Sequence, residues 1–166
     1  MKTRTLVIGG AGLILLGWLF LEIAQGNRIE QPIAFNHKKH VQNHVPCAVC
    51  HPLYKKYARA GIPGVRICVR CHEDVIYRNK EKDKIQKYYT SNQEIPWQRV
   101  YRVKPHVYFS HRRHVAIAKL ACSECHGKVQ QLEKPITAQA LKIKMKNCLN
   151  CHEKQNASVD CVDCHR

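Results

Sequence analysis

Every cysteine in the chain belongs to one repeated pentapeptide, Cys-x-x-Cys-His. The ten cysteines form five pairs, and a histidine directly follows the second member of each pair. This spacing places two thiols and one imidazole on a single turn, facing the same ligand. The motif attaches c-type haem: the thiols bond the vinyl groups of the porphyrin, and the histidine binds the iron. The five motifs occupy residues 47–51, 68–72, 122–126, 148–152 and 161–165.

We number these predicted haem sites 1 to 5 in chain order. Zinc sites and thioredoxin-like dithiols also use paired cysteines, but neither needs a histidine after the second one. The expected cofactors are therefore five covalently bound haem c groups. The attachment residues are Cys47, Cys50, Cys68, Cys71, Cys122, Cys125, Cys148, Cys151, Cys161 and Cys164. The proximal iron ligands are His51, His72, His126, His152 and His165.

The composition indicates that the haems themselves form most of the core. Beyond the N-terminus the chain has few long apolar runs, and it contains only three phenylalanines. We expect a mostly irregular fold, with short α-helices around stacked c-type haems. Without haem the polypeptide should stay largely unfolded, as small metal-dependent domains do.

The chain is strongly basic, with a formal net charge of +16. Five ferric haems with their propionates lower this to about +11. The lysines and arginines are mostly scattered, which favours a role in neutralising propionates and solvating a small body; an anionic lipid surface or an acidic partner protein is the alternative. Nothing resembles a nucleic-acid recognition module, so no nucleic-acid partner is expected.

The N-terminus predicts export. Lys2 and Arg4 precede an apolar stretch over residues 6–21, longer than most signal-peptide cores and slightly short of a full membrane span. We expect residues 1–24 to be a retained single-pass anchor in the cytoplasmic (inner) membrane, with the haem domain on the periplasmic or exported side. A signal cleaved near residues 24–26 is the alternative. Four glycines are candidates for helix contacts with partner subunits: Gly9, Gly10, Gly12 and Gly17.

Two related modules follow the predicted anchor. The sequence Phe-x-His-x-x-His occurs twice. The first copy begins at Phe35, and its last residue, His40, lies seven residues before the motif of site 1. The second copy begins at Phe109, ahead of site 3. We expect a two-haem module over residues 25–78, a linker over 79–100 and a three-haem module over 101–166. The linker should start with a short solvated helix and end extended, because Ile95 precedes a proline.

Histidines three residues apart leave one helical turn at different angles, so each can reach a different iron. This geometry predicts that the histidines of the two repeats are distal ligands: His37, His40, His111 and His114. An iron with two strong protein ligands has no position for a substrate. The prediction is therefore an electron-transfer subunit rather than an enzyme.

The motifs resemble those of class III multihaem cytochromes. The stretch 97–115, with residues 122–127 and 141–148, further resembles the membrane-anchored pentahaem subunit of alternative complex III and of related quinone-linked respiratory complexes. The resemblance implies that His106 is the fifth distal ligand. It also implies transfer of electrons within a quinol-oxidising complex to a periplasmic or exported acceptor. The implied partners are quinone-binding membrane subunits, an iron–sulfur protein, and an acceptor cytochrome or oxidase.

Two further residues and two further functions stay open at this stage. His44 is a propionate partner or a surface residue. Met145 is either an alternative iron ligand, which would raise the potential of its haem, or a packing residue against porphyrin. The alternative functions are a multihaem enzyme with one open iron and a stand-alone membrane quinol dehydrogenase. The sequence does not give the pairing of distal ligands with haems, the electron donor and acceptor, or the direction of flow.

Overall fold

The computed structural model describes residues 29–73 and 79–165, together with residue 17. In this part of the chain all helices are short, and the one β-bridge joins Val107 to His165. The expected irregular fold with short helices is confirmed for these residues. The helices are α2 (His37–Gln42), α3 (Cys47–Cys50), α4 (Val65–His72), α5 (Lys80–Thr90), the π-helix η2 (Arg112–Ile117), α6 (Ser123–His126), the 3₁₀-helix η3 (Val129–Gln131), α7 (Met145–Lys154) and α8 (Cys161–Cys164).

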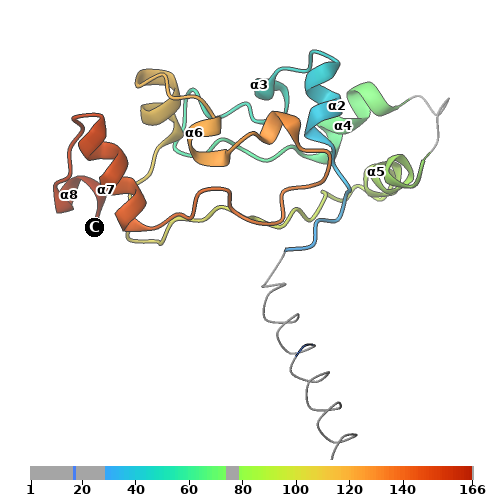
Figure 1. The fold of residues 1–166 in the computed structure, drawn as a ribbon. Helices are drawn as coiled ribbons and strands as arrows, with labels where there is room; N and C mark the ends of the chain where they lie inside the picture. The colour runs from blue at the N-terminus through green and yellow to red at the C-terminus, as the bar shows by residue number, and fades with distance from the viewer. Residues whose placement is uncertain (1–16, 18–28, 74–78, 166) are drawn as a thin grey trace, which may run out of the picture.

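The body is elongated, and its helices follow one another along the long axis (Figure 1). Helices α5 and α4 occupy one end, and α7 and α8 occupy the other, beside the C-terminus. Helices α3 and α6 lie between them. The long segments that connect these helices run along the body without forming a sheet.

A small hydrophobic core lies at the α4–α5 end. Within the described residues the buried hydrophobic side chains are Ile33, Val65, Val69, Ile85 and Ile95. Trp97 packs against this cluster, and its indole Nε1 donates to the carbonyl oxygen of Pro63 at 2.9 Å. Five apolar side chains are few for a chain of this size, which agrees with a core completed by porphyrin.

Helix α5 forms where the sequence predicts a helix, but it is not fully solvated. Asn79 caps its N-terminus by accepting from the backbone of Glu81 and Lys82, each at 3.0 Å. Acidic residues in the first turn suit the helix dipole. Further along the helix, Ile85 is buried on the face of α5 that packs against α4. The expectation of a solvated helix is therefore wrong for this face, because tertiary contact with α4 covers it.

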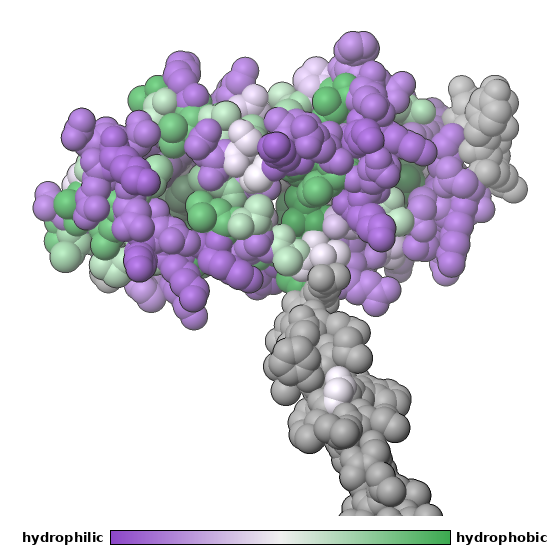
Figure 2. All heavy atoms as spheres, viewed as in Figure 1, coloured by the Kyte–Doolittle hydropathy of each residue, from purple (hydrophilic) through white to green (hydrophobic). Residues whose placement is uncertain are grey.

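The surface exposes apolar side chains in hollows between hydrophilic ridges (Figure 2). Several of them follow or lie within the haem motifs, among them Val49, Leu53 and Val162, the last 80% exposed. Isolated apolar side chains are normal on a surface, but these three lie within or shortly after the predicted haem-attachment motifs.

The predicted membrane anchor lies, apart from residue 17, outside the described residues. Among the residues that are described, no helix has both the length and the apolar character to cross a membrane.

Candidate haem-binding sites

Each of the five motifs contains one turn of helix. Site 1 is on α3, site 2 is the last turn of α4, and site 4 is in the middle of α7. Site 3 is on α6, with Cys122 as the N-cap, and site 5 is on α8. All ten cysteines lie in the described part of the chain, and none forms a disulfide. The thiols and the adjoining imidazole of each motif thus stay available to one ligand.

Burial keeps several of these thiols protonated. It raises the pKa of Cys68 to about 11, with a smaller contribution from the nearby Cys50. Burial also raises the pKa of Cys50, Cys125 and Cys148. A raised pKa disfavours the thiolate, which is the nucleophilic form of cysteine. These thiols therefore do not resemble catalytic cysteines.

The first two-histidine segment forms α2. The side chain of Asn36 caps the helix by accepting from the backbone of Lys39 at 2.8 Å. Phe35 stacks on His40, with ring centroids 4.4 Å apart, and meets His37 edge-on at 4.7 Å. The two imidazoles therefore leave one helical turn in different directions, as the spacing predicts.

The second two-histidine segment repeats this geometry. Phe109 stacks on His114 at 4.6 Å and meets His111 edge-on at 5.0 Å. The backbone differs, because the segment continues as the π-helix η2 rather than an α-helix. The predicted internal repeat is thus visible in the side-chain arrangement. The two phenylalanines orient the imidazoles, a role that sequence reasoning missed although both repeats contain one.

The structure brings distal candidates and proximal histidines together in pairs. The ring centroids of His40 and His72 are 6.0 Å apart, and those of His111 and His126 are 6.4 Å apart. For His114 with His152 the separation is 6.0 Å, and for His106 with His165 it is 5.5 Å.

The distal candidate left over is His37, and the proximal residue left over is His51. Burial, together with smaller effects of the His51 and His40 imidazoles, lowers the pKa of His37 to about 4. The neutral imidazole is the form that binds a metal. Four of the five proximal histidines therefore have a distal candidate beside them. By elimination, His37 is the candidate for His51.

These separations fit an iron between two imidazoles. Two metal–nitrogen bonds of about 2.0 Å, together with the distances from nitrogen to ring centre, give about 6 Å. The thiols of the same motifs stand ready for the thioether bonds. The described residues thus fit a haem group held between two histidines at sites 2 to 5.

Hydrogen bonds to backbone carbonyl oxygens orient several of these rings. The Nδ1 atoms of His51 and His152 lie 2.8 Å from Gly61 O and 2.6 Å from Ser158 O. His40 and His114 each reach the carbonyl oxygen four residues earlier, at 2.8 Å. A carbonyl only accepts, so Nδ1 carries the proton in each ring and Nε2 is left for the metal. In contrast, the buried Nδ1 of His37 has no hydrogen-bond partner.

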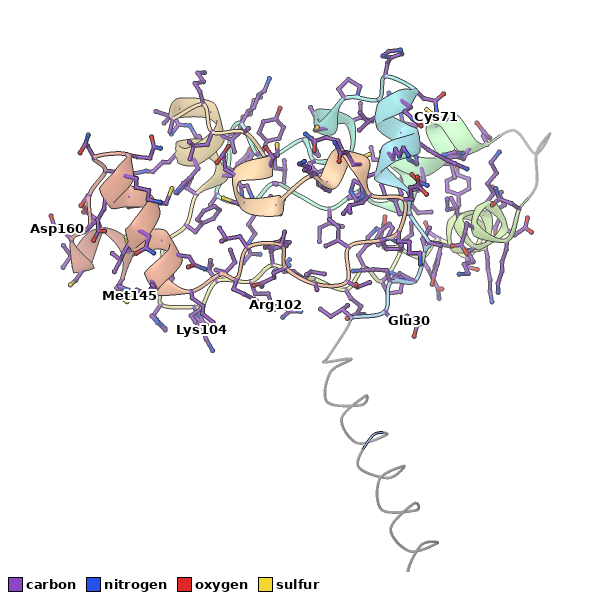
Figure 3. The ribbon with its side chains drawn as sticks, in the orientation of Figure 1. Glu30, Cys71, Arg102, Lys104, Met145 and Asp160 are labelled. Carbon is purple, nitrogen blue, oxygen red and sulfur yellow. The ribbon has the colours of Figure 1, made fainter. Side chains whose placement is uncertain are left out.

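The two surplus candidates lie outside the pairs. His44 is exposed and has a left-handed backbone, with φ of 57°. Met145 begins α7 and is 57% exposed, and it stands at the start of that helix in Figure 3. Because His114 is already opposite His152, site 4 does not need Met145 as an axial ligand.

Comparison with known proteins agrees with this reading of the motifs. Residues 22–98 match the class III cytochrome C family, and residues 107–166 match cytochrome c7 and related cytochrome c. A relative from Nitratidesulfovibrio vulgaris, the multihaem cytochrome c subunit of a menaquinone reductase, is 30% identical over 198 aligned positions. The alignment covers 98% of this chain and 93% of the relative. The chain belongs to the multihaem cytochromes c. This cytochrome is an electron-transfer component rather than a catalytic enzyme, as predicted.

Proposed function

We propose that this cytochrome carries five haem c groups, each held by two histidines, and transfers electrons within a quinone-linked respiratory complex. The observation that supports this most directly is the presence of a second histidine beside the proximal histidine at four of the five motifs. Two imidazoles occupy both axial positions of an iron, so that the haem exchanges electrons without binding a substrate. The chain's own contribution is to hold the imidazoles in place and to cover the porphyrin faces.

The proposed direction of flow is toward menaquinone. The relative that aligns over almost the whole chain is named as a subunit of a menaquinone reductase. The second candidate is the reverse direction, from a quinol to a periplasmic or exported acceptor, and the resemblance to the subunit of alternative complex III supports it. Both candidates require partner subunits that carry the quinone chemistry.

We propose that the segment over residues 1–24 holds the cytochrome in the cytoplasmic membrane beside these partners. A test replaces this segment by a cleavable signal and compares the released cytochrome with the full chain in membranes. Released protein should keep its haems and its reduction by dithionite, but should lose electron exchange with quinone. Exchange at the native rate by the released protein would contradict the proposal.

The direction is tested on the complex purified with the full chain. Turnover from a reduced donor cytochrome to menaquinone would support the first candidate. Turnover only from menaquinol to an oxidised acceptor cytochrome would support the second. Substitution of the distal ligand His40→Ala should lower either turnover, while the surface variant His44→Ala should not.

A further inference from the structure

The order of the haem sites along the molecule differs from their order along the chain. Helix α2 is shared by the first two sites, because His40 pairs with His72 of site 2 and the other histidine of α2, His37, is the distal candidate that remains for site 1. The histidines are three residues apart on one turn. Sites 1 and 2 are therefore immediate neighbours.

Site 1 is connected to a candidate haem ligand of the second module. The loop that follows site 1 supplies the carbonyl oxygen of Gly61 to His51 and that of Ala58 to His111. Ala58 O lies 2.8 Å from His111 Nδ1 and also accepts from the backbone nitrogen of His111 at 3.0 Å. Since His111 pairs with His126 of site 3, this loop connects site 1 directly with site 3.

Site 2 lies at the end of the body that is formed by α4 and α5. Its helix α4 packs against α5 and the small hydrophobic core. Figure 1 shows α3 between α4 and α6 along the body, so site 1 separates site 2 from site 3.

The last three sites keep the chain order. His111 and His114 come from one short segment and pair with His126 of site 3 and His152 of site 4. From site 4 a short loop leads to site 5: the carbonyl oxygen of Ser158 accepts from His152, and Asp160 directly precedes α8. Site 5 is closed by the segment that bears His106, where Tyr108 N donates to Cys164 O at 2.8 Å.

We infer that the five haem sites form one unbranched row in the order 2–1–3–4–5, which ends at sites 2 and 5. Figure 3 shows the two ends: Cys71 of site 2 lies on α4, and Asp160, just before site 5, lies at the opposite end of the body. This inference deepens the proposed function and rests on it, because it says where electrons enter and leave. Sites 1 and 3 form the joint through which every electron passes between the modules.

The test uses two substitutions on the same helix, His37→Ala and His40→Ala, in the full-length haem-loaded protein. Each leaves one five-coordinate ferrous haem after dithionite reduction. That haem is paramagnetic, whereas six-coordinate haems with two imidazoles are diamagnetic in the ferrous state. It therefore broadens the proton NMR signals of the haems next to it. Contacts between each haem and its own motif assign the haem methyl signals to sites.

The row predicts different neighbours for the two variants. His37→Ala should remove the haem methyl signals of sites 2 and 3, and His40→Ala those of site 1 alone. Carbon monoxide makes the altered haem diamagnetic and should restore all lost signals. A row in chain order gives the opposite result: loss at site 2 alone for His37→Ala, and at sites 1 and 3 for His40→Ala. That outcome would overturn the inference.

A third variant, His111→Ala, keeps the test decisive if His37→Ala or His40→Ala prevents haem loading. His111→Ala alters site 3 and should broaden the signals of sites 1 and 4; broadening at sites 2 and 4 would overturn the order. His44→Ala is the matched control, four residues after His40, and should broaden no signal. No quinone is used, so a failure of this test is distinct from a failure of the proposed function.

Discussion

The Nδ1 atom of His111 lies 2.8 Å from the carbonyl oxygen of Ala58, which precedes it by 53 residues. Because a carbonyl oxygen only accepts, the ring donates through Nδ1 and keeps Nε2 for the metal. The same oxygen also accepts from the backbone nitrogen of His111. One backbone atom of the first module therefore orients a ligand of the second, so that the two modules cannot move apart without disturbing site 3.

Replacement of His106 by alanine should convert one haem in five to the high-spin form. The ring centroids of His106 and His165 are 5.5 Å apart. Each of the other distal candidates is assigned to a different proximal histidine. Electron paramagnetic resonance of the ferric protein measures the change. The reduced variant should also bind carbon monoxide at one haem, whereas the wild-type protein should bind almost none. An unchanged low-spin spectrum in the variant would remove His106 from the ligand set. Binding by the wild-type protein would indicate an open haem.

Replacement of Met145 by leucine should leave the spectrum and the potential of site 4 unchanged. The sulfur is not needed opposite His152, because His114 occupies that place at 6.0 Å, and the side chain is 57% exposed. Stability should change by less than about 0.5 kcal/mol, as for most surface substitutions. Redox titration checks the potential. A clear fall in the potential of one haem would show that the thioether ligates it.

Site 4 should have a lower reduction potential than site 5. Both its histidines have Nδ1 close to a carbonyl oxygen, at 2.8 Å for His114 and 2.6 Å for His152. Such hydrogen bonds make imidazole a stronger donor to iron and stabilise the ferric state. Among the described contacts, neither His106 nor His165 has a corresponding bond. NMR of haem methyl signals during stepwise reduction should show site 5 reduced before site 4; the reverse order would contradict this account.

Replacement of Ile85 by alanine should destabilise the α4–α5 end by about 2–4 kcal/mol, because it removes a buried side chain from a small core. Hydrogen exchange of the haem-loaded protein should show faster exchange in α5 than in α7. Lys87→Ala, on the exposed side of α5, is the control and should change little. Equal effects of the two substitutions would mean that α5 is not held by this contact.

The chain without haem should be largely unfolded. The buried hydrophobic cluster in the described residues contains five side chains, and the motif helices α3, α6 and α8 are only four residues long. Helices of that length are unstable alone. Circular dichroism of protein produced without haem attachment should show little helix, and a native-like spectrum would contradict the prediction.

The motifs could be predicted from the sequence because each is local. One turn of helix fixes the two thiols and the imidazole, and three residues fix the divergence of His37 from His40. Both features need no information from the rest of the chain.

Pairing and order could not be predicted in the same way. Nothing near His40 indicates His72 rather than His51 as its partner, and the contact of His111 with Ala58 joins distant segments. The burial of Ile85 was also hidden, because the surrounding sequence is mostly charged and only the position of α4 shows which face is covered. These features depend on tertiary packing, which a local pattern does not contain.

In every pair, the distal candidate precedes its proximal partner in the sequence: His37 and His40 come before residues 51 and 72, and the second module repeats this arrangement. A polypeptide is synthesised from its N-terminus. Each motif therefore emerges after the imidazole that will face it, and no site waits for sequence still to be made. The candidate ligands of each site are thus all present in the chain as soon as its own motif has been synthesised.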